Sequence, residues 1–245
     1  MKSTYRDRLY ANYGQNFQDA GAVFDQKGAQ RWGRAQNYYL RNWLPDDKDA
    51  RIIDLACGGG KLLYFFKQNG YKNLTGIDIS LDQVALTRQV TTEVIQGNVL
   101  EHLEQNPDSY DLIISFDLIE HFHKEEVLRF LDGCHVALKL NGRLILQTPN
   151  ADSPLVSMIR YGDFTHEVCF NPNVLCRLLK LVGFQQTEAR EAGPVPWGYS
   201  GVSTVRYFIW QLIRCGLSLW NLAETGSKGG SVFTRVFLVS GIKGH

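Results

Sequence analysis

The chain has 245 residues, 44% hydrophobic and 21% charged, which is typical of a folded globular protein and argues against a disordered one. Its formal net charge of +1 argues against the strongly basic surface of a nucleic-acid-binding protein. The five cysteines form no CxxC pair and no disulfide framework, so we expect a reducing, cytoplasmic setting and no structural zinc.

The first fifty residues are rich in Tyr, Gln and Asn, and they contain no apolar run of the kind found in a secretory signal. A helix is predicted from about Lys27 to Trp43, and Pro45 follows it as a stop signal. We therefore expect residues 1–50 to form a helical segment in front of the main fold.

From residue 51 onward, strand-like and helix-like patterns alternate. The predicted strands are 51–56, 73–79, 93–97, 110–116, 142–150, 184–191 and 232–243, and the predicted helices are 60–70, 81–90, 124–138 and 171–184. This alternation predicts an α/β fold with a doubly wound, mostly parallel, seven-stranded, Rossmann-like sheet and an antiparallel edge strand. A ligand crevice is expected at the carboxyl ends of the first and fourth strands.

The turn after the first strand combines a carboxylate with glycines. Asp54 precedes the run Gly58 to Gly60, where a dinucleotide-binding protein would have GxGxxG and a pyrophosphate. A carboxylate at this place repels a pyrophosphate and favours a nucleoside that carries a cation. S-adenosylmethionine fits, since it has an amine and a sulfonium and no phosphate. Asp78 ends the second strand, where an acid can bind two ribose hydroxyls.

At these residues the sequence resembles the class I S-adenosylmethionine-dependent methyltransferases, over about residues 50–190. The resemblance implies that Asp54 and the glycine turn hold the methionyl end of the cofactor and that Asp78 holds its ribose. Ala56 stands where the family has its first glycine, and we expect the turn to avoid positive φ there. The cofactor-binding residues that it implies are Tyr13, Asp54, Ala56, Gly58, Gly60, Asp78, Ile79, Asn98, Val99, Phe116 and Asp117.

Asn98 replaces the family's usual aspartate, so the adenine contact is expected through its amide oxygen or through the backbone of Val99. Phe116 and Asp117 are expected beside the sulfonium. In related enzymes an N-terminal segment folds over the cofactor, which leads to the hypothesis that Tyr13 touches the methionyl carboxylate.

The stretch after the fourth strand bears on the acceptor. It reads SFDLIEHFH and lacks the Asp/Asn-Pro-Pro-aromatic signature of enzymes that methylate nucleobase amines, so no nucleic-acid partner is expected. The favoured interpretation of Glu120 and His121 is packing and hydrogen bonding at a helix start. His121 and His123 are two positions apart and would diverge on a helix, so no metal site is predicted.

The loop after the fifth strand gathers Tyr161, Asp163, Thr165, His166 and Glu167. A hydroxyl nucleophile needs a base, and His166 is the first candidate, with Asp163 to orient its imidazole. The alternative is that His166 and Glu167 only fasten the loop to the core. The pattern of this region is similar to methyltransferases of bacterial surface-glycan synthesis, which implies a hydroxyl of a sugar or lipid-linked saccharide as acceptor.

Residues 191–231 form an aromatic segment, whose helix-like part is interrupted by charges and is too polar to span a bilayer. Three interpretations stay open: a lid or dimer interface, peripheral contact with the inner face of the membrane, or ordinary core. We expect a single methyltransferase domain over 1–245, with 1–50 covering the cofactor, 51–190 as the core, 191–231 inserted and 232–245 as the last strand.

Alternative functions also stay open. The same fold can methylate another small metabolite, such as a phenol, a carboxylate or an amine. It can also serve as a non-catalytic cofactor-binding partner protein. An NAD-dependent oxidoreductase is disfavoured by Asp54 before the glycines and by the absence of GxGxxG.

Overall fold

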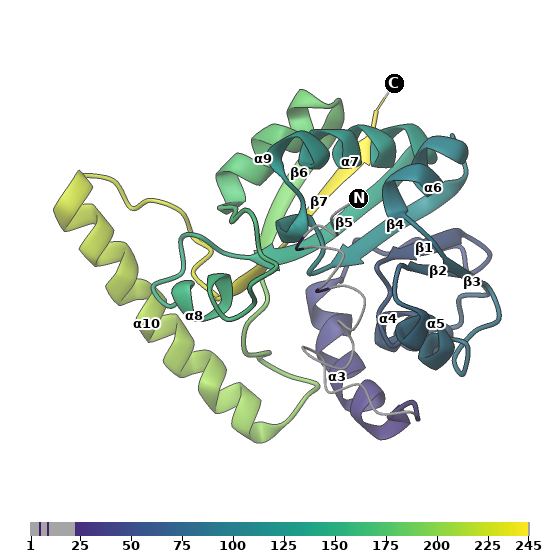
Figure 1. Cartoon of the computed structure of the whole chain (residues 1–245). Helices are drawn as coiled ribbons and strands as arrows, with labels where there is room; N and C mark the ends of the chain where they lie inside the picture. Colours follow the sequence, from purple (N-terminus) through teal and green to yellow (C-terminus); the bar gives the residue numbers. More distant parts are fainter. Residues whose placement is uncertain (1–4, 6–8, 10–22, 245) are drawn as a thin grey trace.

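The computed structural model describes residue 5, residue 9 and residues 23–244. Within this part of the chain, seven strands form one sheet in the order β3-β2-β1-β4-β5-β7-β6 (Figure 1). The strands are β1 (Arg51–Leu55), β2 (Asn73–Asp78), β3 (Val94–Gln96), β4 (Tyr110–Phe116), β5 (Leu138–Pro149), β6 (Phe184–Glu191) and β7 (Val236–Lys243). All seven strands were predicted, and the predicted fold class is confirmed.

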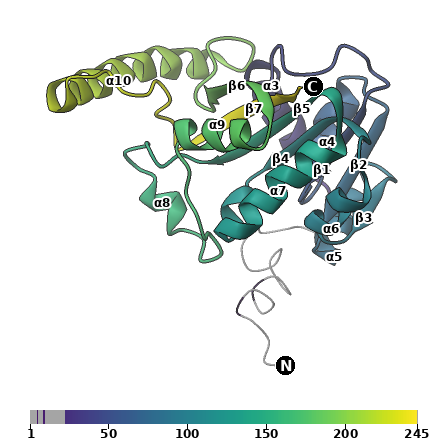
Figure 2. The same cartoon turned by 90° about the horizontal axis from the view of Figure 1, so that it is seen from above.

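Helices cover both faces of this sheet. They are α3 (Gln26–Tyr39), α4 (Lys61–Gln68), α5 (Leu81–Thr87), α6 (Val99–Gln105), η1 (Ile119–His121), α7 (Lys124–Ala137), α8 (Ser157–Arg160), α9 (Pro172–Leu181) and α10 (Gly201–Thr225). One hydrophobic core joins α6, α7 and α9 to one face, and a second joins α3, α4 and α5 to the other. The result is a three-layer α/β/α arrangement (Figure 2).

Strand β4 shows why its apolar run was readable in the sequence. Leu112, Ile113 and Ile114 are all fully buried. Ile113 packs into one core, whereas Leu112 and Ile114 pack into the other, because successive side chains of a strand point to opposite faces. A strand buried on both faces therefore has no polar alternation.

The strand order reverses between β1 and β4, which both run parallel to their neighbours. The carboxyl ends of the two strands meet at this switch point, which is where a ligand crevice is expected. The antiparallel strand is β7, and it pairs with β5 on one side and β6 on the other. It therefore lies one position inside the sheet, and the edge strand β6 is parallel to β5.

Helix α10 lies along one side of the molecule and extends beyond the sheet (Figures 1 and 2). Ser203 is the one buried residue among its 25. Its exposed apolar side chains are Val202, Val205, Phe208, Ile209, Leu212, Ile213, Leu219, Trp220 and Leu222. Among the described helices, none is long and apolar enough to cross a membrane.

Asn150 fixes the return of the chain from α10 into β7. It is fully buried, and its Nδ2 donates to the carbonyls of Val232 and Thr234, each at 2.9 Å. Its Oδ1 accepts from the amide of Asp152 at 3.0 Å. One side chain thus satisfies three backbone groups.

Asn150→Ala is expected to lower the free energy of unfolding by about 3 kcal/mol, because it leaves buried backbone groups without partners. Urea denaturation measures this change. Asn73→Ala is the matched control: its Nδ2 also donates to a carbonyl, but at an exposed place. A loss below about 1 kcal/mol is expected there, and equal losses in the two variants would contradict the assignment.

Candidate active site

The turn between β1 and α4 is built on left-handed backbone. Ala56, Gly58 and Gly60 have φ values of 57°, 49° and 80°. The expectation that Ala56 avoids positive φ is therefore wrong. The amide of Cys57 donates to the carbonyl of Ile77 at 3.0 Å, which ties the turn to the end of β2 and helps hold Ala56 in this conformation at a cost of roughly 1–2 kcal/mol.

Gly60 meets two requirements at once. Besides its positive φ, a Cβ added there would lie 3.1 Å from the side chain of Thr87 on α5. The Thr87 hydroxyl donates to the carbonyl of Gly58 at 2.5 Å. The turn is therefore packed directly against α5, and its amides at Cys57 and Gly58 bind the end of β2.

Asp54 and Asp78 stand at these two strand ends, 2% and 7% exposed. Asp78 accepts from the amide of Gly58 at 2.8 Å and from the amide of Ser80 at 2.9 Å. Burial raises the pKa of both carboxyls, and the charge of Asp78 raises the pKa of Asp54 further. Within the described part of the chain, no lysine or arginine forms an ion pair with either carboxylate. A cationic ligand such as S-adenosylmethionine fits this pair.

Three further residues expected at the cofactor follow the ends of β2 and β3. The side chain of Ile79 is exposed just after β2. Asn98 caps α6, and its Oδ1 accepts from the amide of Leu100 at 2.8 Å, so one of its two lone pairs is already used. Val99 is buried as the first residue of α6. Tyr13 lies outside the described residues.

Phe116 ends β4 and faces the helix α3, and Asp117 follows directly after the strand. The ring of Phe116 packs edge-on against Trp32 of α3, with 6.2 Å between centroids. Asp117 has a φ of 54°, and its carboxylate accepts from Nε2 of Gln147 on β5. Helix α3 therefore covers the end of β4, where the sulfonium is expected.

A second group of polar side chains lies behind Asp117. Glu120 on η1 is fully buried, and its Oε2 accepts from the hydroxyl of Thr148 at 3.0 Å. Burial raises the pKa of Glu120 well above its usual value, and the charge of Asp117 raises it further. The backbone carbonyl of Glu120 accepts from the amides of Glu167 and Val168, which fastens the loop after β5 to η1.

His121 and His166 meet in this group. Their ring centroids are 4.8 Å apart with an interplanar angle of 69°. His121 is buried and lies 2.8 Å from the hydroxyl of Thr165, whereas His166 is half-buried with its Nδ1 3.1 Å from the carbonyl of Ile159. One ligand atom from each of Glu120, His121 and His166 lies within 4.8 Å of the others.

The structure changes one detail of the sequence prediction for this loop. His166 Nδ1 lies 3.1 Å from the Ile159 carbonyl, whereas Asp163 accepts from the amide and hydroxyl of Thr165 at 2.8 and 2.6 Å. The negative charge of Asp163 still acts on His166. His123 diverges from His121 as expected, and it pairs with Glu167 at 3.5 Å.

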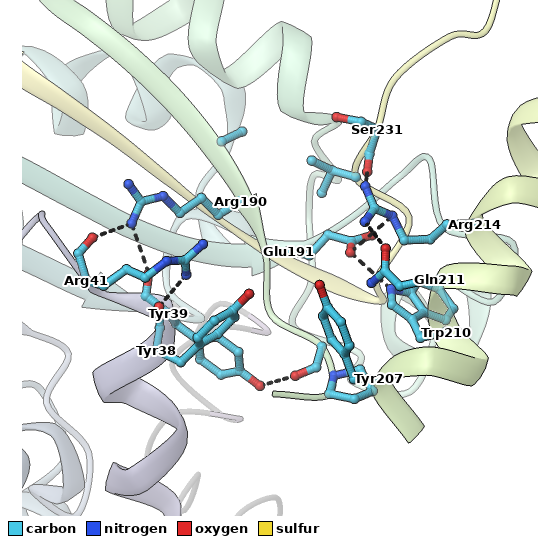
Figure 3. A pocket seen from close by; sticks show the side chains of 14 residues that line it. Tyr38, Tyr39, Arg41, Arg190, Glu191, Tyr207, Trp210, Gln211, Arg214 and Ser231 are labelled. Carbon is cyan, nitrogen blue, oxygen red and sulfur yellow. Dashed lines mark hydrogen bonds and ion pairs between the residues drawn. The ribbon is translucent and has the colours of Figure 1, made fainter. Parts of the chain in front are cut away.

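A pocket of about 200 Å³ lies farther along the same edge of the sheet, between α3, the end of β6 and α10 (Figure 3). Aromatic side chains line it beside arginines and amides. Glu191, at the end of β6, accepts from Nε1 of Trp210 at 3.0 Å and pairs with Arg214 at 3.4 Å. The sequence does not predict this pocket, because its walls come from segments that are far apart in the chain. The contacts of Glu191 with Trp210 and Arg214 of α10 appear only in the folded structure.

The N-terminal stretch reaches the loop after β5 at one described point. The ring of Tyr5 packs edge-on against Phe164, with 6.5 Å between centroids. Phe164 stands between Asp163 and Thr165, so this contact lies beside the group that contains His121 and His166.

Comparison with known families agrees with this geometry. Residues 28–189, more than half of the chain, match a family described as "Methyltransferase domain". The ubiquinone biosynthesis O-methyltransferase of Aeromonas salmonicida is 27% identical over 163 residues, covering 58% of this chain and 67% of that protein. The Vibrio cholerae protein of the same name is 24% identical over 153 residues, covering 56% and 61%. The chain spans about two thirds of the length of these curated relatives.

Solved structures show the same fold. A SAM-dependent methyltransferase from Archaeoglobus fulgidus superposes with a TM-score of 0.63 at 19% identity, covering 94% of this chain and 98% of the other. The second structure is phosphoethanolamine N-methyltransferase 2 of Haemonchus contortus, in complex with phosphomonomethylethanolamine and S-adenosylhomocysteine. It superposes with a TM-score of 0.65 at 16% identity, covering 99% of this chain and 61% of the other.

Asp54→Asn is expected to weaken binding of S-adenosylmethionine by about 10- to 100-fold, because a charge-assisted hydrogen bond of about 1.5–3 kcal/mol is lost. Isothermal titration calorimetry measures the dissociation constant. Asp111→Asn is the matched control, since Asp111 pairs with Lys139 and stands at the start of β4, away from the crevice. An unchanged affinity in Asp54→Asn would remove Asp54 from the cofactor site.

The affinity for S-adenosylmethionine is expected to depend on pH through Asp54. Its raised pKa means that the carboxyl takes up a proton at a higher pH than an exposed aspartate does. The cation prefers the ionised form, so the affinity is full above the raised pKa and falls as the pH drops through it. Titrations between pH 8 and 5 measure this slope, and an equally steep slope in Asp54→Asn would assign it to another group.

Proposed function

We propose that this chain, which belongs to the methyltransferase-domain family, transfers a methyl group to a hydroxyl of a small molecule. The acceptor that we favour is a sugar or a lipid-linked saccharide. The chain is an S-adenosylmethionine-dependent methyltransferase. The observation that carries the choice of a hydroxyl is the group formed by buried Glu120 and His121 and half-buried His166 after the end of β4.

The donor half of the site needs little chemistry from the protein. S-adenosylmethionine supplies a methyl group that is already activated by the sulfonium. The part of Asp54, Asp78 and the glycine turn is to hold the donor at the switch point, and α3 excludes water over Phe116. Positioning thus accounts for much of the expected rate.

The acceptor half explains why a hydroxyl is favoured over an amine. A neutral amine attacks with its own lone pair, whereas a hydroxyl must lose a proton. His166 is proposed to activate the hydroxyl, because its Nδ1 faces the Ile159 carbonyl and its Nε2 then carries the lone pair. Asp163 is proposed to assist in two ways. Its negative charge acts on His166, and it accepts from the hydroxyl of Thr165, which contacts His121.

The pocket beside α10 supports a saccharide. Tyr207 and Trp210 line it with aromatic rings, and Gln211 and Arg41 line it with polar groups. This combination suits a ring with both apolar faces and hydroxyls. The pocket lies at the carboxyl end of β6, on the edge of the sheet where β1 and β4 also end. It is proposed to hold a part of the acceptor remote from the methylated oxygen.

The exposed apolar face of α10 is proposed to receive the lipid of such an acceptor at the inner surface of the membrane, with the enzyme in the cytoplasm. Packing of this face in a homodimer is the alternative. A second candidate acceptor is a phenolic quinone precursor, and the observation in its favour is the name of the O-methyltransferases from Aeromonas and Vibrio.

The test uses S-adenosylmethionine labelled in the methyl group, incubated with the purified chain and an extract of the source cell, followed by organic and aqueous partition. Label in the organic phase that mild acid hydrolysis releases as a methylated sugar is the expected result. Organic label that stays on an aromatic ring after hydrolysis would favour the quinone precursor. Label on nitrogen would contradict the proposal. Asp54→Asn is the control for label that does not depend on the enzyme.

A further inference from the structure

We propose that Glu120, His121 and His166 form a site for one divalent transition-metal cation of the Zn²⁺ type, which activates the acceptor hydroxyl. The inference rests on the proposed function and specifies how His166 acts: as a metal ligand instead of a free base. The three side chains come from η1 and from the loop after β5, and one ligand atom of each lies within 4.8 Å of the others. Small side-chain adjustments bring such atoms to a common ion.

Glu120 supplies the observation that points to a ligand. It is fully buried, and its Oε1 has no hydrogen-bond partner within the described part of the chain, while Oε2 accepts from Thr148. A buried carboxylate oxygen without a partner is costly unless a cation or a donor satisfies it. The carboxylates of Asp117 and Asp163 add negative charge close by. A cation in this position offsets both effects.

The hydrogen bonds of the two imidazoles leave Nε2 as the nitrogen that can bind a metal. The single hydroxyl proton of Thr165 is donated to Asp163 at 2.6 Å, so its oxygen accepts from Nδ1 of His121 at 2.8 Å. His166 likewise donates from Nδ1 to the Ile159 carbonyl at 3.1 Å. Both rings therefore carry the lone pair on Nε2, and this outer set of hydrogen bonds is the usual one around metal-bound histidines.

The donor set selects the type of cation. Two imidazoles and one carboxylate suit Zn²⁺ and its first-row neighbours, whereas Mg²⁺ and Ca²⁺ prefer sites made of oxygen alone. Three protein ligands leave one tetrahedral position open, as in catalytic zinc sites. The acceptor oxygen is proposed to occupy that position.

The cation makes the reaction feasible near neutral pH. Bound Zn²⁺ lowers the pKa of a water ligand from about 15.7 to about 7, and an alcohol oxygen in the same position loses its proton in the same way, here to solvent. The acceptor oxygen then forms a bond to the methyl carbon while the carbon–sulfur bond breaks and its electron pair stays on sulfur. One proton is released for each methyl group transferred.

The test starts with binding and uses the full-length chain. The protein is treated with EDTA, exchanged into metal-free buffer and titrated with ZnCl₂ by calorimetry, with MgCl₂ in parallel. We expect one Zn²⁺ per chain and no comparable heat from Mg²⁺. Thr165→Val, which breaks the bond that orients His121, is expected to weaken Zn²⁺ binding by about 10- to 100-fold. His166→Ala removes a ligand and is expected to weaken it more.

The matched control is His135→Gln. His135 is also half-buried and also packs against a ring, that of Phe184, but it lies near the far end of α7 from η1. Its Zn²⁺ affinity should equal that of the wild type. Far-UV circular dichroism and a thermal melt in EDTA check that each variant is folded. If Thr165→Val does not fold, His166→Ala still tests the site, because His166 is only half-buried.

Activity separates this inference from the proposed function. Methyl transfer that EDTA abolishes and Zn²⁺ restores supports both. Transfer to a hydroxyl that continues unchanged after the chain is shown to be metal-free overturns the metal site and leaves the proposed function standing, with His166 as a base. Zn²⁺ binding that survives in His166→Ala and Thr165→Val at wild-type affinity also overturns it.

Discussion

Two buried carboxylates at neighbouring strand ends, Asp54 and Asp78, are the constraint on which the donor half of the site depends. They are held apart from solvent by a turn whose backbone is left-handed at three positions and whose amide at Gly58 binds Asp78. That arrangement couples β1, β2 and α5 to a single geometry. It costs electrostatic free energy in the empty site, and a ligand with a sulfonium and an ammonium recovers that cost on binding. The same physics disfavours a pyrophosphate.

The acceptor half has a different origin. Its side chains stand on η1 and on a loop that reaches back over η1 through backbone hydrogen bonds from Glu167 and Val168 to Glu120. The loop therefore carries His166 to the end of β4, where it meets His121. The backbone hydrogen bonds show that the loop is fastened to η1 and thereby positions His166. The role of His166 as a base stays a prediction. The family and the fold show a methyltransferase domain, whereas the roles of individual residues in both halves are our proposal.

The sequence predicts the parts of the molecule that depend on local pattern. Strand β4 is a continuous apolar run because both its faces are buried. Asn171 followed by Pro172 predicts the start of α9. The positive φ of Ala56 was missed, because a hydrogen bond from Cys57 to β2 overrides the usual preference of alanine. The sequence also does not predict contacts between residues that are far apart in the chain. The spacing of His121 and His123 gives no hint that the ring of His121 packs against His166 on the loop after β5. No spacing rule joins two residues so far apart in sequence.

A crystal structure of the chain with S-adenosylhomocysteine tests the account most directly. The account predicts the ribose hydroxyls at Asp78, the ammonium within hydrogen-bond distance of Asp54, and the sulfur at Phe116, pointing toward the group of Glu120, His121 and His166. S-adenosylhomocysteine bound with its sulfur directed away from that group, or seated in the pocket beside α10, would contradict it.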